Sequence, residues 1–219
     1  AGNVSAGPGA YIVEAAVLTS GAIYRWFRES FYGTGESFST VNAEAAAAAP
    51  GAGGVLMLPH FKGCGSPHWD AQARGVFYNL GLNTTRGDMA RAIFEGVALE
   101  MRGCLDLIER LCGSVETVSV SGGMTRSELF NQIQSDVFGR PVQRFGSDEA
   151  TSLGAWIAGA VAVGLESGYP AAFARGAGGV PVSTCRPDPA CRAVYDALFR
   201  RAKALYEALR SPDLRELFQ

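Results

Sequence analysis

Residues 118–138 read VSVSGGMTRSELFNQIQSDVF. The pattern predicts a strand over residues 115–121, a tight turn at Gly122-Gly123 and a helix over residues 127–138. Glycines at the end of a strand let a ligand approach the backbone closely, because no Cβ is in the way. The following helix directs its free N–H groups to the same place, and such strand ends collect ligands in α/β sheets. Phosphate or adenosine is the expected ligand. An ordinary tight turn is the alternative, since neither GxGxxG nor the P-loop pattern is present.

The segments around this stretch alternate between the two hydrophobic periods. The predicted strands cover residues 10–18, 55–58, 75–80, 115–121 and 142–145, and the predicted helices cover residues 21–31, 41–49, 84–112, 127–138, 151–164 and 190–209. Residues 1–8 are turn-prone, and residues 59–74 and 176–182 are expected to be loops. This order predicts an α/β fold.

Composition limits the classes of function. With 219 residues, 47% hydrophobic and 18% charged, the chain fits one globular domain. A net charge of −2 argues against partners that are nucleic acids or anionic membranes. The sequence contains no apolar run of about 20 residues, the length that spans a bilayer, and no cleavable leader is recognised. We therefore expect a cytoplasmic protein.

Cysteine and histidine usage gives no metal site. The five cysteines include no CxxC pair, and we expect small buried thiols in a reducing compartment, with a Cys185–Cys191 disulfide as the alternative. Only two histidines, His60 and His68, are present, and they do not assemble a zinc site. No metal ligand is assigned.

Three ordered groups of residues resemble the FGGY family of carbohydrate kinases. The first is LPHFKG at residues 58–63, SPHWD at 66–70 and Arg74-Gly75. The second is GVFYNL at 75–80 and DMARAIFEG at 88–96, where Asn79 stands at a usual glycine position. The third is SGGMTRS at 121–127, then Gln132, Asp136, Gly139 and Pro141-Val142, and EATSLGA at 149–155. Arg186-Pro187-Asp188 and Tyr195 are similar to the closing segment of the family.

The resemblance implies an actin-like, ribonuclease H-like ATPase domain with a mixed sheet between helices. Residues 1–219 would form the C-terminal nucleotide-binding domain, without the N-terminal sugar-binding domain. The whole protein would use ATP and Mg²⁺ and would transfer the γ-phosphoryl group to a sugar or polyol hydroxyl. A homodimer is compatible with the family.

The resemblance also implies which residues bind the nucleotide. Gly122 and Gly123 would lie against it, and Ser127 would sit near the adenine or ribose. Gly21, Tyr24 and Arg25 would contact the base or ribose from the other side. Tyr24 could pack on the ring, and Arg25 could hydrogen-bond or stack. The alternative for Tyr24 and Arg25 is an exposed helix face.

No catalytic residue is expected in this chain. The family's base, in a GDQ-like turn, and its GTS-like phosphate turn are not found, so the isolated chain should be inactive. Asp70 lies in the long loop without an evident basic partner, and Asp148-Glu149 fits a loop or cap. A non-catalytic module for assembly or partner binding is the alternative function, with residues 59–69 and the last helix as its surface. A third hypothesis is that the chain is half of an actin-like or chaperone-type ATPase.

Overall fold

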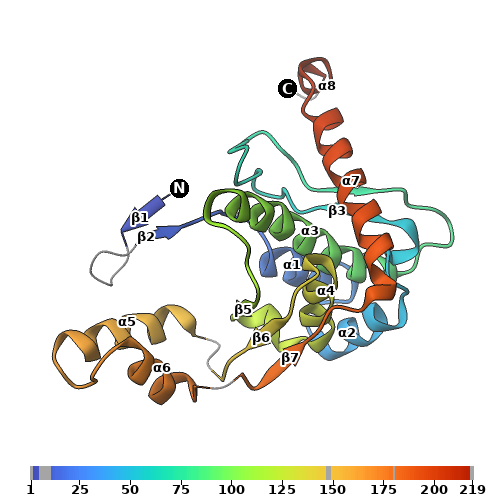
Figure 1. The fold of residues 1–219 in the computed structure, drawn as a ribbon. Coiled ribbons are helices and arrows are strands. Elements are labelled where there is room, and N and C mark those ends of the chain that lie inside the picture. The colour runs from blue at the N-terminus through green and yellow to red at the C-terminus, as the bar shows by residue number, and fades with distance from the viewer. Residues whose placement is uncertain (1, 5–10, 147–148, 180, 218–219) are drawn as a thin grey trace.

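Helix α3, Arg86–Cys112, runs through the centre of the molecule (Figure 1). The computed structural model describes residues 2–4, 11–146, 149–179 and 181–217. Helix α3 starts with a capping box, in which the Asp88 N–H donates to Thr85 Oγ1 at 3.1 Å and the Thr85 N–H donates to Asp88 Oδ2 at 2.9 Å. The predicted helix over residues 84–112 is confirmed, with Asp88 in its first turn.

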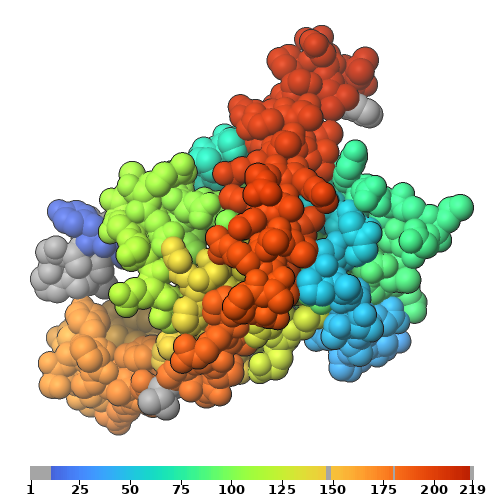
Figure 2. Space-filling view, turned by 45° about the vertical axis from the view of Figure 1, so that its right-hand side comes forward, coloured from blue at the N-terminus to red at the C-terminus, as the bar shows by residue number. Residues whose placement is uncertain are grey.

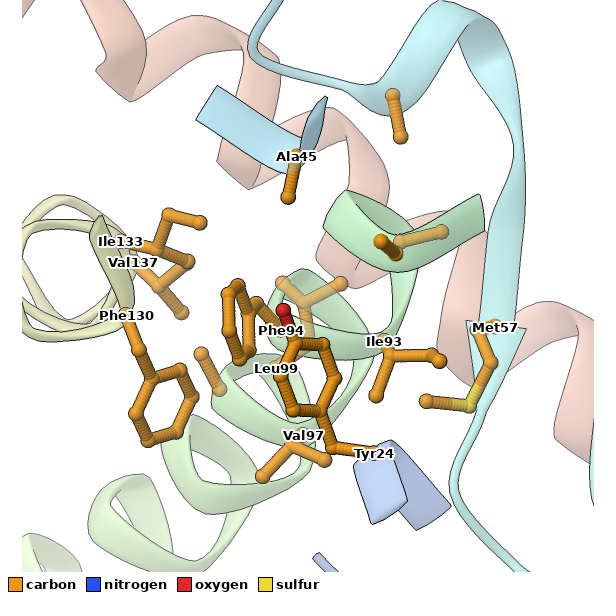
Figure 3. Close-up of a cluster of buried hydrophobic side chains, with 14 of the residues drawn as sticks. Tyr24, Ala45, Met57, Ile93, Phe94, Val97, Leu99, Phe130, Ile133 and Val137 are labelled. Carbon is orange, nitrogen blue, oxygen red and sulfur yellow. The ribbon is translucent and has the colours of Figure 1, made fainter. Parts of the chain in front are cut away.

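Four helices pack around α3 and enclose the core. They are α1 (Gly21–Phe31), α2 (Phe38–Ala47), α4 (Glu128–Phe138) and α7 (Arg192–Leu209). Figure 3 shows side chains of α1, α2, α3 and α4 meeting around Phe94, with Phe130, Ile133 and Val137 supplied by α4. Because apolar residues recur every three or four positions, each helix presents one buried face to α3.

The strands are short and form three separate sheets. The largest has the order β5-β6-β7, in which β5 (Val118–Val120) is parallel to β6 (Val142–Arg144), and β6 is antiparallel to β7 (Ser183–Cys185). Two antiparallel pairs complete the set: β1 (Gly2–Val4) with β2 (Tyr11–Val13), and β3 (Leu56–Leu58) with β4 (Val76–Tyr78). Each of these strands has three residues. The mixed sheet expected from the resemblance is therefore present in a reduced form.

Helices α5 (Ala150–Ala162) and α6 (Tyr169–Ala177) form a hairpin at one side of the molecule. Figure 2 shows them as a distinct orange lobe. Helix α5 consists almost wholly of small apolar residues. Even so, Ala160 is its only buried residue, with 5% of its surface exposed. The helix predicted over residues 151–164 is confirmed, and Glu149 is its N-cap residue without a side-chain capping bond; Asp148 lies outside the described residues.

The C-terminal helices cover the long loop after β3. Helix α8 (Pro212–Glu216) follows α7, and the Tyr206 hydroxyl of α7 donates to Asp70 Oδ2 at 3.0 Å. Arg215 also forms an ion pair with Asp70. The expectation that Asp70 has no basic partner is therefore wrong, because its partner lies 145 residues further along the chain.

Several elements differ from the sequence predictions. The strand expected over residues 10–18 is reduced to β2, and residue 10 lies outside the described part. Strands β1 and β7 and helices α6 and α8 were not predicted. The loop expected over residues 176–182 starts later, since residues 176 and 177 end α6; residue 180 is not described. Within the turn-prone segment of residues 1–8, residues 2–4 form β1, and the others lie outside the described part. Three 3₁₀ turns complete the fold: Ala52–Gly54, Gly123–Arg126 and Pro189–Cys191.

The structure explains how asparagine is accommodated at position 79, where the family pattern usually has glycine. Its φ of +67° lies in the left-handed region, which asparagine tolerates better than most residues. Its side-chain amide donates to the Gly54 carbonyl at 3.1 Å and holds this turn. The departure from the family pattern therefore keeps the backbone conformation that the glycine would supply.

All five cysteines are free thiols, so the Cys185–Cys191 disulfide is not formed. Cys64 and Cys104 are buried as expected, whereas Cys112 is exposed and the other two are half-buried. Among the described residues, none of the helices has both the length and the hydropathy to cross a bilayer.

Candidate functional site

A cavity of about 980 Å³ opens beside the end of β5, and all six residues predicted to bind nucleotide line it. Its wall includes Gly21, Tyr24 and Arg25 from α1, and Gly122, Gly123 and Ser127 from the turn before α4. The fold therefore brings together two segments that lie about 100 residues apart in the chain. Which ligand these residues bind is taken up below as a proposal.

The two segments meet at Gly21 and Met124. A Cβ built on Gly21 would lie 3.5 Å from Met124 Cγ, an ordinary van der Waals contact. Gly21 is the first residue of α1, so the first turn of α1 lies against the 3₁₀ turn Gly123–Arg126. Both α1 and α4 begin at this cavity, and helix N-termini carry unpaired N–H groups and a partial positive charge.

The Gly122-Gly123 turn has open space around both glycines, and two hydrogen bonds from neighbouring side chains stabilise it. A Cβ at either glycine would meet no atom within 4 Å, and Gly122 has a φ of +98°. The Thr125 hydroxyl donates to the Gly122 carbonyl at 2.8 Å, and the buried Asn131 amide donates to the Thr125 carbonyl at 2.8 Å. Thr125 and Asn131 were not predicted as site residues. They hold the turn through the hydrogen bonds that fix its shape.

Ser127 has a structural task in this arrangement. Its side chain is 8% exposed and accepts a hydrogen bond from the Phe130 N–H at 3.4 Å, which makes it the N-cap of α4. The residue thus orients the helix N-terminus toward the cavity.

Tyr24 is part of the hydrophobic core. It is 5% exposed, and its ring stacks on Phe94 at 4.4 Å and on Phe38 at 5.7 Å between ring centroids. Figure 3 shows this ring inside the buried cluster. The hydroxyl donates to Asn42 Oδ1 at 2.7 Å, and burial raises the pKa of Tyr24, so it stays a neutral donor. The expected stacking of Tyr24 on a base, and its alternative as an exposed helix face, are both at odds with this packing.

Arg25 is the residue of α1 whose side chain is available. It is exposed, lines the cavity and has no hydrogen-bond or ion-pair partner among the described residues. Arg126 is the other charged residue of the lining, and it takes part in an interaction. Because no carboxylate of the described chain lines this cavity, its charged groups are cationic and favour an anion.

Much of the remaining wall is apolar, and these residues were not predicted; Ser20, Asn42, Ser119, Ser121 and Gln134 add polar groups to it. Phe94, Met101, Leu105, Phe130 and Phe138 contribute from α3 and α4. These residues belong to the helical core pattern, so nothing in their spacing marks them as cavity residues. A concave apolar wall with a few polar groups is the usual form of a small-molecule site.

Comparison with known proteins decides the family. The sequence profile of the C-terminal domain of the FGGY family of carbohydrate kinases matches residues 1–163. The chain belongs to the FGGY family. A glycerol kinase of Alkalilimnicola ehrlichii is 38% identical to this FGGY chain over 167 residues, which are 75% of the chain and 33% of that relative. The chain thus spans about a third of the length of the curated relatives it matches.

Solved structures of the family have the same fold. The xylulose kinase from Rhodospirillum rubrum superposes with a TM-score of 0.76 at 30% identity, covering 89% of this chain and 38% of that one. The Plasmodium falciparum glycerol kinase with ADP superposes with a TM-score of 0.76 at 21% identity, covering 92% of this chain and 40% of that one. The actin-like ATPase fold implied by the resemblance is therefore confirmed for this FGGY chain.

Proposed function

We propose that the protein containing this chain is an ATP-dependent carbohydrate kinase, and that this chain supplies the nucleotide side of its active site. The whole protein would transfer the γ-phosphoryl group of ATP to a hydroxyl of a sugar or polyol. The observation that carries the proposal is the cavity that joins Gly21 and Arg25 to the open Gly122-Gly123 turn. Membership of the FGGY family, whose matched relatives include glycerol and xylulose kinases, supports it.

Each group has a role that follows from its position. Gly122 and Gly123 let the backbone approach the nucleotide, because no side chain stands between them and the cavity. Arg25 is exposed and has no partner within the described part of the chain, so its guanidinium can donate to ribose or phosphate oxygens. The apolar wall from α3 and α4 accommodates the purine ring. Ser127 and Tyr24 shape this site through the cap and the core packing described above.

The described lining of the cavity does not offer the ligands that Mg²⁺ prefers. The ion takes oxygen ligands, usually one or two carboxylates together with substrate phosphates. Among the described residues no carboxylate lines the cavity. We therefore propose that Mg²⁺ arrives with the nucleotide and that its protein ligands do not come from the described wall of this cavity.

The first test is an isothermal titration of Mg-ADP into the 219-residue chain and its Gly123→Leu variant. A Cβ at Gly123 would meet no other atom, and the backbone φ of Gly123 is not positive. Leucine therefore fits this position without backbone strain, and its side chain occupies space in the cavity that Gly123 lines. We expect binding by the parent chain and a loss of at least about tenfold in affinity, or 1.4 kcal/mol, in the variant.

Gly35→Leu is the matched control. Gly35 is exposed, lies between α1 and α2 and also has open space at its Cβ, but it does not line the cavity. Its affinity for Mg-ADP should equal that of the parent chain. Equal losses in both variants would reject the assigned site, whereas absence of binding together with a stable oligomer would favour the assembly module.

A further inference from the structure

A second group of chemically active side chains lies away from the nucleotide cavity. His60, Cys64 and Glu100 have ligand atoms that all lie within 4.8 Å of one another. None of the three lines the nucleotide cavity, and the proposed kinase reaction does not use them. The spacing of two histidines and five cysteines predicted no metal site, because Glu100 comes from a distant helix.

The fold brings these residues together at the junction of three elements. His60 follows β3 by two residues, Cys64 lies in the next turn, and Glu100 is on α3. The backbone of Cys64 pairs with that of Asp70 through two hydrogen bonds of 2.8 and 2.9 Å, which fix the backbone that carries the thiol. Tyr206 of α7 packs against His60 with ring centroids 5.1 Å apart and closes the group from outside.

The separations suit a small ion. Cys64 Sγ lies 3.4 Å from Glu100 Oε1, and His60 Nε2 lies 3.3 Å from Glu100 Oε2. Zinc bonds of 2.0–2.3 Å in tetrahedral geometry place ligand atoms about 3.3–3.6 Å apart. Each of the two separations falls in this range, one through each oxygen of the Glu100 carboxylate.

The histidine is the second, independent observation. His60 is 3% exposed, and neither of its ring nitrogens has a hydrogen-bond partner among the described residues. Its contact with Glu100 is an ion pair only when the imidazole carries a proton. A buried imidazole without a hydrogen bond is costly, and coordination of a cation by Nε2 would satisfy it.

We propose that His60, Cys64 and Glu100 bind one Zn²⁺ ion, with water as the fourth ligand. A thiolate, an imidazole and a carboxylate form a donor set that zinc accepts. Mg²⁺ and Ca²⁺ prefer oxygen ligands only, so the thiol selects against them. The ion would join the loop of residues 59–74 to α3.

A second cavity, of about 420 Å³, touches one member of the group. It is lined by His60, Tyr206, Arg74 and Gln72 among others, and it lies between the loop and the C-terminal helices. Neither Cys64 nor Glu100 is among its lining residues, so the cavity reaches the group at the imidazole.

Zinc binding must release a proton from Cys64. Burial and the nearby Glu100 carboxylate raise the pKa of this thiol to about 12, so without metal it keeps its proton at neutral pH. The ion binds the thiolate, and the displaced proton goes to solvent.

The experiment is a Co²⁺ titration of the chelator-treated 219-residue chain, followed by displacement with Zn²⁺. Cys112 is exposed and can bind metal by itself, so Cys112→Ser serves as the parent background. We expect one equivalent of Co²⁺ to produce thiolate charge-transfer absorption, and Zn²⁺ to abolish it. Cys64→Ser should remove this absorption, and Glu100→Gln should weaken binding at least about tenfold.

Cys104→Ser is the matched control. Cys104 is a buried thiol one turn beyond Glu100 on α3, but it is not part of the group. Its titration should equal that of the parent. The proposal is overturned if the parent shows no thiolate absorption, or if Cys104→Ser loses as much as Cys64→Ser. Should Cys64→Ser not fold, unchanged affinity in Glu100→Gln overturns it as well.

Discussion

At the scale of single residues, Arg91 and Glu95 form a buried ion pair at the centre of the molecule. Glu95 Oε1 accepts from Arg91 Nε at 2.8 Å, from the Gly51 N–H at 2.9 Å and from the Tyr195 hydroxyl at 3.1 Å. Arg91 and Glu95 are at most 5% exposed. The pair ties α3 to α7 and to the turn after α2, so its members depend on one another.

Glu95→Gln should destabilise the chain by about 3–5 kcal/mol, because it leaves the Arg91 guanidinium buried without a counter-charge. Urea unfolding followed by fluorescence measures this change. Glu207→Gln is the control, since its pair with Arg210 is exposed and worth at most about 1 kcal/mol. Similar midpoint shifts in the two variants would contradict the assigned role of the buried pair.

Some residue roles followed from the sequence, and others required the fold. Gly122-Gly123 was predicted as a turn, because a turn depends on neighbours in the chain. The burial of Tyr24 did not follow, since Phe94, on which its ring stacks, lies 70 residues away. The partner of Asp70 is more distant still.

At the scale of elements, helix α3 approaches β3 so closely that only glycine fits between them. A Cβ on Gly96 would lie 2.3 Å from the Met57 carbonyl oxygen. Gly103 is on the same helix, yet a Cβ there would only touch Phe199 at 3.9 Å. Alanine substitutions at the two glycines therefore distinguish the effect of close packing on stability from the effect of helix propensity.

Gly96→Ala should destabilise the chain by about 1–3 kcal/mol, because α3 or β3 must shift. Gly103→Ala should stabilise it by up to about 1 kcal/mol through higher helix propensity. Thermal unfolding of both variants checks the pair of signs. Stabilisation by Gly96→Ala would show that the close approach is not maintained in solution.

Long amphipathic elements were predicted well, whereas several short elements were missed. Helix α1 has the predicted limits, because its apolar spacing and the preceding turn mark both ends. Helix α6 was missed among glycines, although Pro170 near its start is a recognised signal for a helix beginning. Most of the strand predicted over residues 10–18 has no ladder partner among the described residues, and an apolar stretch alone does not make a strand.

For the molecule as a whole, apolar groups remain uncovered on β2 and around α5. Tyr11 and Ile12 are 80% and 43% exposed, and Val163 and Leu165 are 80% and 58% exposed. Strand β2 pairs only with β1 among the described strands, so it presents an open edge. Open apolar edges pair with other chains.

We therefore predict that the 219-residue chain self-associates at high concentration, which light scattering would detect. Ile12→Lys should reduce the association, because a charge on an edge strand blocks pairing. Leu82→Lys is the control, as Leu82 is fully exposed in a loop and the added charge is the same. A clean monomer at high concentration would contradict the prediction, and a defined dimer would instead fit the homodimer that the family resemblance permits.

The candidate site shows what sequence can and cannot supply at this scale. Gly122 and Gly123 were predicted from the strand, turn and helix pattern, and Gly21 and Arg25 from the resemblance to a family. The apolar wall from α3 and α4, and the meeting of His60, Cys64 and Glu100, depend on contacts between distant segments. Residue spacing along the chain carries no information about them.

The brevity of the strands has a spectroscopic consequence. Each strand contains three residues, whereas α3 alone contains 27 and α7 contains 18. Although the fold class is α/β, far-ultraviolet circular dichroism of this chain will be dominated by its helices. Thermal unfolding followed by this signal therefore reports on the central helices, and loss of the short sheets would change the signal very little.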